Sequence, residues 1–499
     1  MLPPPIPEPV TRVPLLSGNR ISVVDLPEGG VVLRPPPPTD VLRDVGAATR
    51  EALRFPLAGE PLASLVRPGA TATVVIEMPN LPIPSASPDP RQEAIAATVD
   101  ELERLGIGHV TILVASGLGR RPSPREIGFL VPPDFRRRFR GRLIVHDAES
   151  PELVELGTVA GLPIRVSPAL VETDLLVCVT AAETVLEGGP AALLRACSRE
   201  LLRASGATSL LEPSSSQGWS LAIELERVLA ARVPLFGVSL VLNLPHVFGG
   251  YPYEEQILER IARSKLRRAL GLLPAGIRNS VIERVPRELS AAAVLGATPS
   301  AAHTEALLRA IEFKGATLAE PLDAIVIGIP PTTPFMPREL PNPVSAAYFG
   351  LGLALRMWRN TFPVRPGGTA ILLHDFQRRF PAPVQSPYRA LFADPRTARD
   401  SEALREAEHA ALTSRAISDY RAGRSLHPLE PFLSWSACDA ALSRLGPVLV
   451  AGCRDASSAR QLGFVPVHNV GAALAMARGG GAERIGLLLS PPYFPLVVG

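Results

Sequence analysis

Short apolar runs alternate with amphipathic helical patterns through the first half of the chain. Residues 71–79, TATVVIEMP, are followed by a helical pattern over residues 90–105, which has an acidic second half and stops before two glycines. The apolar run 109–117, a helix-like stretch over 125–139 and the run RLIVHD at 142–147 continue the series. The order strand, helix, strand, helix, strand is typical of a parallel α/β sheet.

The same alternation continues over the rest of the chain. Further strands are predicted at residues 161–167, 173–180, 234–243, 323–330, 367–376, 447–453 and 485–491, and further helices at 191–205, 220–232, 300–313, 346–359 and 470–480. The charged helical stretch 253–289 is the candidate connection between two domains, and the polar segment 381–429 is expected to be loop and exposed helix. We therefore predict two α/β domains with mainly parallel sheets and an interdomain cleft, the first over residues 1–290 and the second over 291–499.

Composition and charge narrow the class of protein. The 499 residues are 46% hydrophobic and 20% charged, which is typical of a globular chain with sizeable cores. The net charge is only +3 and the arginines are spread among acids, so we expect no nucleic-acid partner. The basic run 136–142 is interpreted as a solvated helix end, with a phosphate contact as the alternative. No apolar run reaches the roughly 18 residues of a membrane span, and the proline-broken N-terminus does not resemble a signal peptide, so a cytoplasmic protein without membrane contact is expected.

Lysine, cysteine and histidine usage restricts the available chemistry. Only Lys265 and Lys314 of the 51 basic residues are lysines. One lies in a basic helix and the other ends a helix, so both are expected to face solvent, which limits any mechanism that needs a lysine as Schiff base or covalent tether. The four cysteines lack Cys-x-x-Cys spacing and no two histidines have the spacing of metal ligands, so we expect a reducing compartment and no metal site.

The loops that follow the predicted strands form the candidate site, because ligands of open α/β sheets bind beyond the carboxyl ends of the strands. These loops are residues 77–84, 117–123, 146–147, 180–189, 330–341 and 374–375. The candidate substrate-binding residues within them are Asn80, Arg120, Arg121, Glu183 and His146.

Two kinds of side chain in these loops have a specific chemistry. Arg120 and Arg121 are suited to bind a carboxylate or phosphate bidentately, with a solvated turn as the alternative. The steps 146–147 and 374–375 each place a histidine before an aspartate, which is a possible acid/base pair. The preferred interpretation of both steps is a cap with a surface imidazole.

Several segments resemble, in the same order, those of the nickel-pincer lactate racemase family. Residues 110–126, VTILVASGLGRRPSPRE, resemble the family's strand-and-turn signature A-T-G-x-H-R-P-x-T-x-x-E, and residues 55–77 resemble its approach to the first strand. Residues 171–183 resemble A-E-A-D-L-x-I-x-x-G-x-I-E, with Glu183 on the glutamate, and residues 295–313, 323–328 and 364–373 resemble elements of the C-terminal domain. The resemblance implies an isomerase, a racemase or epimerase of small 2-hydroxy acids.

The family's chemistry, as the resemblance implies it, passes a hydride between a 2-hydroxy acid and a nickel-pincer nucleotide. It uses two proton-shuttling histidines, an arginine for the substrate carboxylate, a lysine that tethers the cofactor and a histidine that ligates nickel. The matching positions for the arginine and the two shuttles hold Leu81, Gly119 and Val185, and the tether segment is shortened to residues 188–191 without a lysine. We therefore expect no nickel-pincer cofactor in this chain, and standard racemisation is in question.

Three hypotheses from different classes follow. The chain is a divergent family member that still processes a small hydroxy acid, or a non-catalytic scaffold that binds a small anion or a nucleotide between its domains through Arg120 and Arg121. The third hypothesis is a protein-interaction role of the proline-rich tracts at 3–9 and 35–38.

Overall fold

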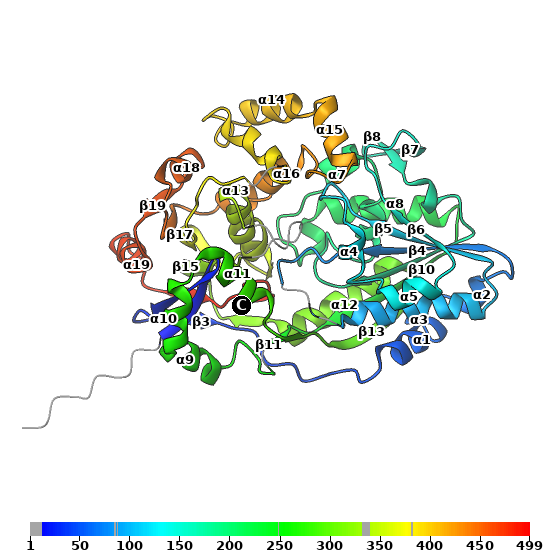
Figure 1. The fold of residues 1–499 in the computed structure, drawn as a ribbon, viewed down its shortest axis with the longest axis horizontal. Coiled ribbons are helices and arrows are strands. Elements are labelled where there is room, and N and C mark those ends of the chain that lie inside the picture. Colours follow the sequence, from blue (N-terminus) through cyan, green and yellow to red (C-terminus); the bar gives the residue numbers. More distant parts are fainter. Residues whose placement is uncertain (1–11, 84–85, 87, 248, 332–339, 381–382) are drawn as a thin grey trace, which may run out of the picture.

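The structure is a computed structural model that describes residues 12–83, 86, 88–247, 249–331, 340–380 and 383–499. The proline tract at 3–9, residue 84 of the first strand-end loop and residues 332–339 of a later one lie outside the described part. Figure 1 shows two lobes side by side, each built around a six-stranded sheet with helices packed on it. Helices and mainly parallel strands confirm the predicted α/β class.

The sheet of the first lobe has the strand order β13-β10-β9-β4-β5-β6. Its strands are β4 (Thr71–Glu77), β5 (His109–Ala115), β6 (Arg142–Val145), β9 (Leu175–Ala181), β10 (Leu235–Leu242) and β13 (Ala291–Ala297). All neighbours are parallel except β13, which runs antiparallel to β10. The carboxyl ends of β4, β5, β9 and β10 therefore meet at one edge, where the site was expected.

Helices cover both faces of this sheet because β4 alternates its side chains between two cores. Val74 and Ile76 pack into a core with α1 (Val45–Arg54) and α3 (Pro90–Arg104), whereas Val75 packs into the opposite core. That second core is covered by α6 (Pro190–Leu194), α7 (Arg199–Ala204) and α8 (Gln217–Ala230). The lobe also contains α2 (Leu62–Leu65), α4 (Pro124–Ile127), α5 (Pro133–Arg138) and the antiparallel hairpin of β7 (Val154–Val159) and β8 (Leu162–Val166).

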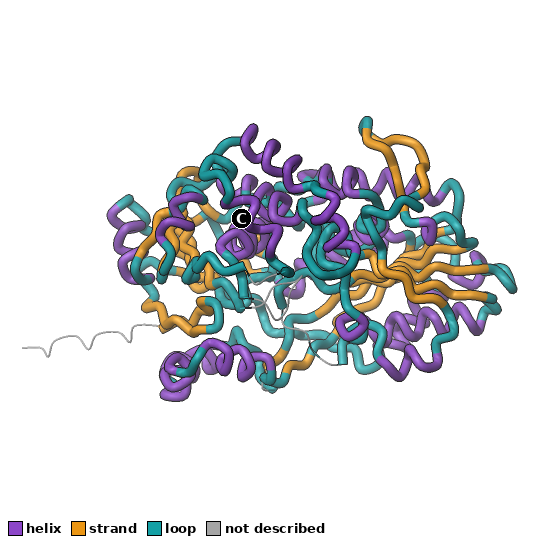
Figure 2. Tube along the Cα trace, turned by 45° about the horizontal axis from the view of Figure 1, so that its top comes forward, coloured by secondary structure: helices purple, strands orange, loops and turns teal. Residues whose placement is uncertain are grey.

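The sheet of the second lobe is parallel throughout, with the order β19-β18-β17-β15-β20-β3. Its strands are β3 (Val31–Leu33), β15 (Leu322–Gly328), β17 (Val364–Leu373), β18 (Val448–Ala451), β19 (Val465–Val467) and β20 (Ile485–Leu488). Helices of this lobe are α13 (Pro343–Ala347), α16 (Glu430–Ser436), α17 (Asp439–Leu442), α18 (Ala456–Gln461) and α19 (Val470–Gly479). Figure 2 shows the strands of the two sheets as two separate groups.

The two sheets do not divide at residue 290, where the sequence placed the domain boundary. Strand β3 lies in the second sheet, paired with β20, although it belongs to the first 35 residues of the chain. The hairpin of β1 (Arg12–Ser17) and β2 (Arg20–Asp25) lies beside β15 of the same sheet. Strand β13 follows residue 290 yet completes the first sheet. The chain therefore begins in the second lobe, crosses to the first and returns.

Several predicted helices are interrupted in the structure. The stretch 346–359 is not one helix: α13 passes into a π-helix, Tyr348–Leu353, and a short 3-10 turn before β16 (Trp358–Arg359). The stretch 125–139 is split between α4 and α5 because Pro132 and Pro133 cannot continue a helix. The connection 253–289 contains three short helices, α9 (Glu255–Arg263), α10 (Lys265–Leu272) and α11 (Ala275–Glu283).

The segment from residue 383 to 429 contains α14 (Ser401–Ala411) and α15 (Ser414–Arg421), which lie at the top of the molecule over the junction of the lobes (Figure 1). Two small sheets contain further strands. The strands β14 (Ala316–Leu318), β21 (Leu496–Val498) and β16 form one sheet, and β11 (His246–Val247) and β12 (Arg287–Glu288) form the other. Helix α12 (Pro299–Lys314) packs against β10 and β13. It thus brings its C-terminal end to the junction.

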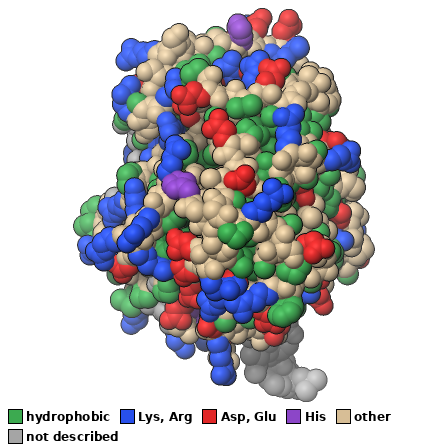
Figure 3. Space-filling model, turned by 90° about the vertical axis from the view of Figure 1, so that its right-hand side faces the viewer, with side chains coloured by type: hydrophobic (Ala, Val, Ile, Leu, Met, Phe, Trp, Pro, Cys, Tyr) green, Lys and Arg blue, Asp and Glu red, His purple; other side chains and the backbone are tan. Residues whose placement is uncertain are grey.

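Acidic and basic side chains both occur across the face of the first lobe that Figure 3 shows. Within the described part of the chain, no helix is both long enough and apolar enough to cross a membrane.

Candidate functional site

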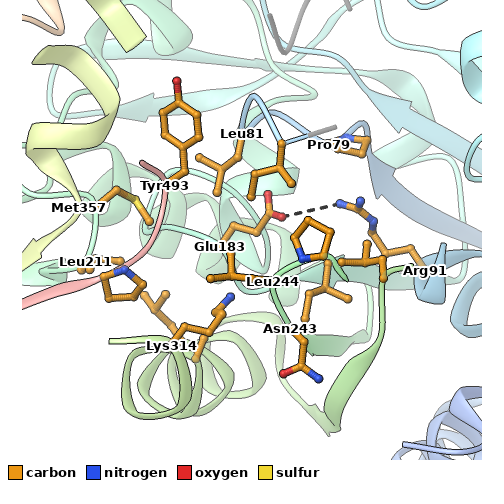
Figure 4. Close-up of a pocket in the computed structure, with 17 residues that line it drawn as sticks. Pro79, Leu81, Arg91, Glu183, Leu211, Asn243, Leu244, Lys314, Met357 and Tyr493 are labelled. Atoms are coloured by element: carbon orange, nitrogen blue, oxygen red, sulfur yellow. Dashed lines mark ion pairs between the residues drawn. The ribbon is translucent and has the colours of Figure 1, made fainter. Parts of the chain in front are cut away.

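A pocket lies at the carboxyl ends of the first sheet's strands, where the second lobe meets them (Figure 4). The first lobe contributes the loop after β4, the loop after β9 and residues 242–245 at the end of β10. Helix α12 contributes Leu307, Ala310 and Lys314, and the second lobe contributes Met357 and Tyr493. The cavity volume is about 40 Å³, far smaller than the several hundred Å³ of a site for a nucleotide-sized ligand.

Arg91 and Glu183 form the polar wall of the pocket. The Arg91 guanidinium is held by Asp89, the N-cap of α3, through Nε and Nη2 at 2.9 and 2.7 Å. Its third nitrogen, Nη1, lies 4.0 Å from the Glu183 carboxylate (Figure 4). The carboxylate of Asp89 thus fixes one edge of the guanidinium, and Nη1 is left to face the pocket with Glu183.

Lys314 lines the same pocket, so the prediction that it faces solvent is wrong. Its side chain extends from the end of α12 toward Glu183 (Figure 4), and burial lowers its pKa below the ordinary 10.5 while Glu183 acts in the opposite direction. Lys314 forms no hydrogen bond and no ion pair with any residue that the structure describes. The other lysine, Lys265, is exposed as predicted.

A second polar cluster lies behind this wall, at the ends of β4 and β5. Arg195 Nε lies 3.2 Å from Glu77 Oε1, and Arg195 Nη2 donates to Asn80 Oδ1 at 3.1 Å and to the Ser116 carbonyl at 3.3 Å. The other oxygen of Glu77 accepts from the Gly188 amide at 2.6 Å. Arg195 therefore joins the loops after two neighbouring strands to the loop after β9.

Two buried carboxyl groups of this region have pKa values close to neutral pH. Burial raises the pKa of Glu77 to about 7, although Arg195 acts in the opposite direction. Burial and the nearby Glu183 raise the pKa of Glu187 to about 8. Carboxyls with such values exchange protons near neutral pH, which is a property found at functional sites as well as in buried ion-pair networks.

Arg120 and Arg121, two of the candidate anion-binding residues, do not face the pocket. Arg120 pairs with Glu126, whose carboxylate also closes the capping box at the start of α4. Arg121 donates to the carbonyl oxygens of Arg421 and Val145, at 3.0 and 3.2 Å. Both guanidinium groups are thus engaged within the turn and its contact with α15, and the sequence hypothesis that they meet a ligand between the lobes lacks support from their positions.

The histidines of the two histidine–aspartate steps are buried and contact backbone groups, as residues with a structural role do. His146 is buried, its Nε2 contacts the Cys197 carbonyl at 2.8 Å, and burial lowers its pKa to about 4. His374 is also buried, its pKa is lowered by burial, and its Nδ1 accepts from the amide of Phe376 at 3.1 Å. Neither imidazole is at the surface, because each closes a strand end inside the protein, and neither lines the pocket.

Comparisons with known proteins found similarity to one family model and to solved structures. Residues 19–188 match the model of the lactate racemase N-terminal domain. This part of the chain is therefore a lactate racemase-like N-terminal domain. The fold of the chain is similar to that of the lactate racemase apoprotein from Thermoanaerobacterium thermosaccharolyticum, with 15% identity and a TM-score of 0.62 over 97% of this chain and 99% of that chain. A crystal structure of a Thermotoga maritima protein is also similar, with 10% identity and a TM-score of 0.48 over 93% and 100% of the two chains. No curated protein matches the sequence.

The lactate racemase-like strand-end loops carry apolar side chains where the resemblance placed the catalytic groups. Leu81 lines the pocket, and Val185 is fully buried in the core shared by the two lobes. Gly119 is buried in the turn beneath α15. Within the described ranges, no group of three or more histidine, cysteine, aspartate or glutamate residues is placed to hold a metal ion.

The resemblance placed the cofactor tether in the loop of residues 188–191. The side chain of His303 occupies the space next to this loop. A Cβ atom on Gly188 would lie 2.6 Å from His303 Cε1, and one on Gly189 would lie 2.4 Å from His303 Cβ. Pro190 and Ala191 are buried. The His303 ring of α12 thus occupies the space above this loop in the lactate racemase-like domain.

Of the candidate substrate-binding residues, Glu183 lines the pocket and Asn80 bonds to Arg195 beside it, each from the loop after a strand. Their role in substrate binding stays a prediction, and four other residues of this region were not among the candidates. Arg91 and Lys314 were missed since they lie on helices, and Glu77 and Arg195 were missed since one ends a strand and the other follows a short helix. A signal for Glu77 was present: a carboxylate closing an apolar strand is unusual unless it has a partner.

Proposed function

We propose that this lactate racemase-like protein binds a small organic acid in the pocket between its lobes and does not carry out nickel-pincer racemisation. The observation that carries the proposal is the Lys314 ammonium, which points into the pocket without a bonding partner in the described structure and faces Glu183. A half-buried cation that lacks a close partner has lost part of its hydration without compensation, and an anionic ligand offsets that loss.

The pocket suits an acid of two or three carbons with a second oxygen. Arg91 Nη1 is directed to the ligand carboxylate, and Lys314 is directed to the hydroxyl or carbonyl oxygen beside it. Leu81, Leu244 and Met357 surround the remaining carbon atoms. The volume of about 40 Å³ supports a hydroxy or oxo acid of this size over a nucleotide, the other ligand considered from the sequence.

The residues present do not fit the nickel-pincer nucleotide. His303 fills the space above residues 188–191, the pocket is too small for a nucleotide, and the described residues supply no set of metal ligands. These observations support the proposal that the chain retains the fold and uses its cleft differently.

A ligand screen tests the proposal. We expect two- and three-carbon hydroxy and oxo acids to raise the thermal unfolding midpoint of the wild-type protein, and the Lys314→Met variant to lose this response. Lys265→Met is the matched control, since it removes the exposed lysine and should respond like the wild type. Racemisation of a hydroxy acid together with stoichiometric nickel in the purified protein would overturn the proposal, as would the absence of a response to every acid.

A further inference from the structure

The environment of Lys314 differs from that of a structural lysine. The pocket around it is lined by Leu211, Leu307 and Met357 beside the carboxylate of Glu183, and no oxygen of Glu183 lies within 4.0 Å of Nζ as an ion pair would require. Lysines that only stabilise a fold are exposed or closely paired. The geometry here places an amine in a small pocket that is accessible to water-sized molecules and otherwise mostly apolar.

We propose that Lys314 is a nucleophile that forms an imine with a small aldehyde or 2-oxo acid in this pocket. The inference rests on the proposed function in that the same pocket takes the small organic acid, and it specifies a carbonyl compound as the ligand class. It also departs from the expectation from the sequence that both lysines face solvent, which limited any Schiff-base mechanism.

Two properties of the site favour this reaction. Burial lowers the pKa of Lys314, so a larger fraction of the amine is unprotonated near neutral pH than for an exposed lysine. Arg91 Nη1 faces the same space and can hold the carboxylate of a 2-oxo acid while its carbonyl carbon meets Nζ. Glu183 lies beside both groups and is the one carboxylate among the residues found to line the pocket.

The reaction is balanced without a redox partner. Unprotonated Nζ attacks the carbonyl carbon, the C–N bond forms, and the π electron pair of the carbonyl moves to its oxygen. Glu183 transfers one proton from nitrogen to that oxygen, which gives the carbinolamine. It then transfers the second nitrogen proton to the hydroxyl oxygen as the C–O bond breaks and the C=N bond forms, so that the oxygen leaves as water. The product is the imine of Lys314, and one molecule of water leaves for each imine formed.

Reductive trapping tests this inference on the full-length protein. Glyoxylate or pyruvate is added with sodium cyanoborohydride, and the adduct is located by mass spectrometry of the intact protein and its peptides. We expect the adduct at Lys314 to exceed that at Lys265 by about tenfold or more. The two lysines of one chain thus serve as test and internal control.

Variants separate nucleophilic from electrostatic effects. Lys314→Arg keeps the positive charge without a nucleophilic amine and should abolish the specific adduct, whereas Lys265→Arg should leave it unchanged. Glu183→Gln should slow adduct formation if Glu183 transfers the proton. Because the comparison of Lys314 with Lys265 is made within the wild-type protein, it remains decisive even where a variant fails to fold.

The outcomes distinguish this inference from the proposed function. Lactate and glycolate cannot form an imine, so their binding measured by ligand-observed NMR tests the pocket alone. Binding of these hydroxy acids without preferential trapping at Lys314 would overturn the covalent inference and leave the proposed function standing. Preferential trapping with no binding of any hydroxy acid would support the inference and restrict the ligands to carbonyl compounds. Neither binding nor trapping would overturn both.

Discussion

Arg195 Nε lies 3.2 Å from the carboxylate of Glu77, and both side chains are largely buried. The pair connects the end of β4 with the loop that follows α6, and through Asn80 and Ser116 it also joins β5. Burial nevertheless raises the pKa of Glu77 to about 7, so the desolvation of this carboxyl outweighs the attraction of its partner. The site is therefore sensitive to pH.

We expect the free energy of unfolding to fall as the pH rises from about 6.5 to 8. Glu77 and Glu187 have pKa values of about 7 and 8 in the folded protein, against 4.5 for a free glutamate, so the folded state holds more protons in this range and loses stability as they leave. His146 and His303 have pKa values lowered to about 4, so their contributions rise with pH only up to about 6.5. Above that value the carboxyls alone determine the slope among these four groups.

Urea unfolding at several pH values measures this slope. Glu77→Gln should reduce the decline between pH 6.5 and 8, because the amide does not titrate. A variant with the same slope as the wild type would show that Glu77 does not carry the pH dependence.

Removal of Arg195 should destabilise the fold strongly. Arg195→Met leaves Glu77 and Asn80 without their partner, and breaking a buried pair in this way costs about 3–5 kcal/mol. Arg227→Met is the matched control, because Arg227 pairs with Glu224 on the surface and the loss of such a pair costs less than about 1 kcal/mol. Chemical unfolding of both variants gives the comparison, and equal losses would contradict the structural role of Arg195.

The contact of Gly189 with His303 predicts a steric effect. Gly189→Ala places a methyl group 2.4 Å from His303 Cβ at a backbone φ of +53°, so we expect a loss of about 2–4 kcal/mol from crowding and backbone strain together. Gly59 has a φ of +87° with no atom within 4 Å of the added Cβ, so Gly59→Ala reports the backbone term alone, about 1–2 kcal/mol. Thermal unfolding of the two variants separates the terms. Similar losses would indicate that His303 moves aside freely.

Arg121 should affect the mobility of α15 more than ligand binding. Its guanidinium donates to the carbonyl oxygen of Arg421 at the end of that helix, while Tyr420 donates to the carbonyl of Gly117 at 3.3 Å. We expect Arg121→Ala to speed hydrogen exchange over residues 414–421 and to change acid binding less than twofold, which corresponds to less than about 0.4 kcal/mol. Arg120→Ala, which removes the pair with Glu126 in α4, should leave exchange in α15 unchanged. A large loss of binding in either variant would restore the original two-arginine hypothesis.

The elements that sequence patterns predicted best are those with continuous apolar runs. Strands β4, β5, β9 and β10 were placed within one or two residues, because a strand buried on both faces is apolar throughout. Strand β3 was missed because its three residues carry little pattern and its partner β20 lies near the other end of the chain. Pairing over such a distance leaves no local signal.

The site was predictable to the extent that it follows from strand ends. This rule placed Asn80 and Glu183 at the sheet edge beside the pocket, and their role in binding stays a prediction. Lys314 was assigned to solvent because a lysine that ends an amphipathic helix is most often exposed. In the folded protein, the second lobe lies against the end of α12, and residues such as Met357 and Tyr493 help to enclose Lys314 in the pocket. Arg120 was named as an anion-binding candidate, but its guanidinium forms an ion pair with Glu126, which lies nearby in the sequence. The positive charge that was expected to bind a ligand is therefore paired within the protein.

The path of the chain through β3 has a consequence for synthesis and truncation. This strand precedes the other strands of the second sheet in the sequence, whereas its partner β20 follows them. During synthesis the edge of this sheet therefore stays uncovered until β20 has been made, and a fragment that starts after residue 33 lacks the strand that covers it. Expression of the second lobe by itself should expose that edge to pairing between molecules, a route to aggregation that pairing with β3 closes.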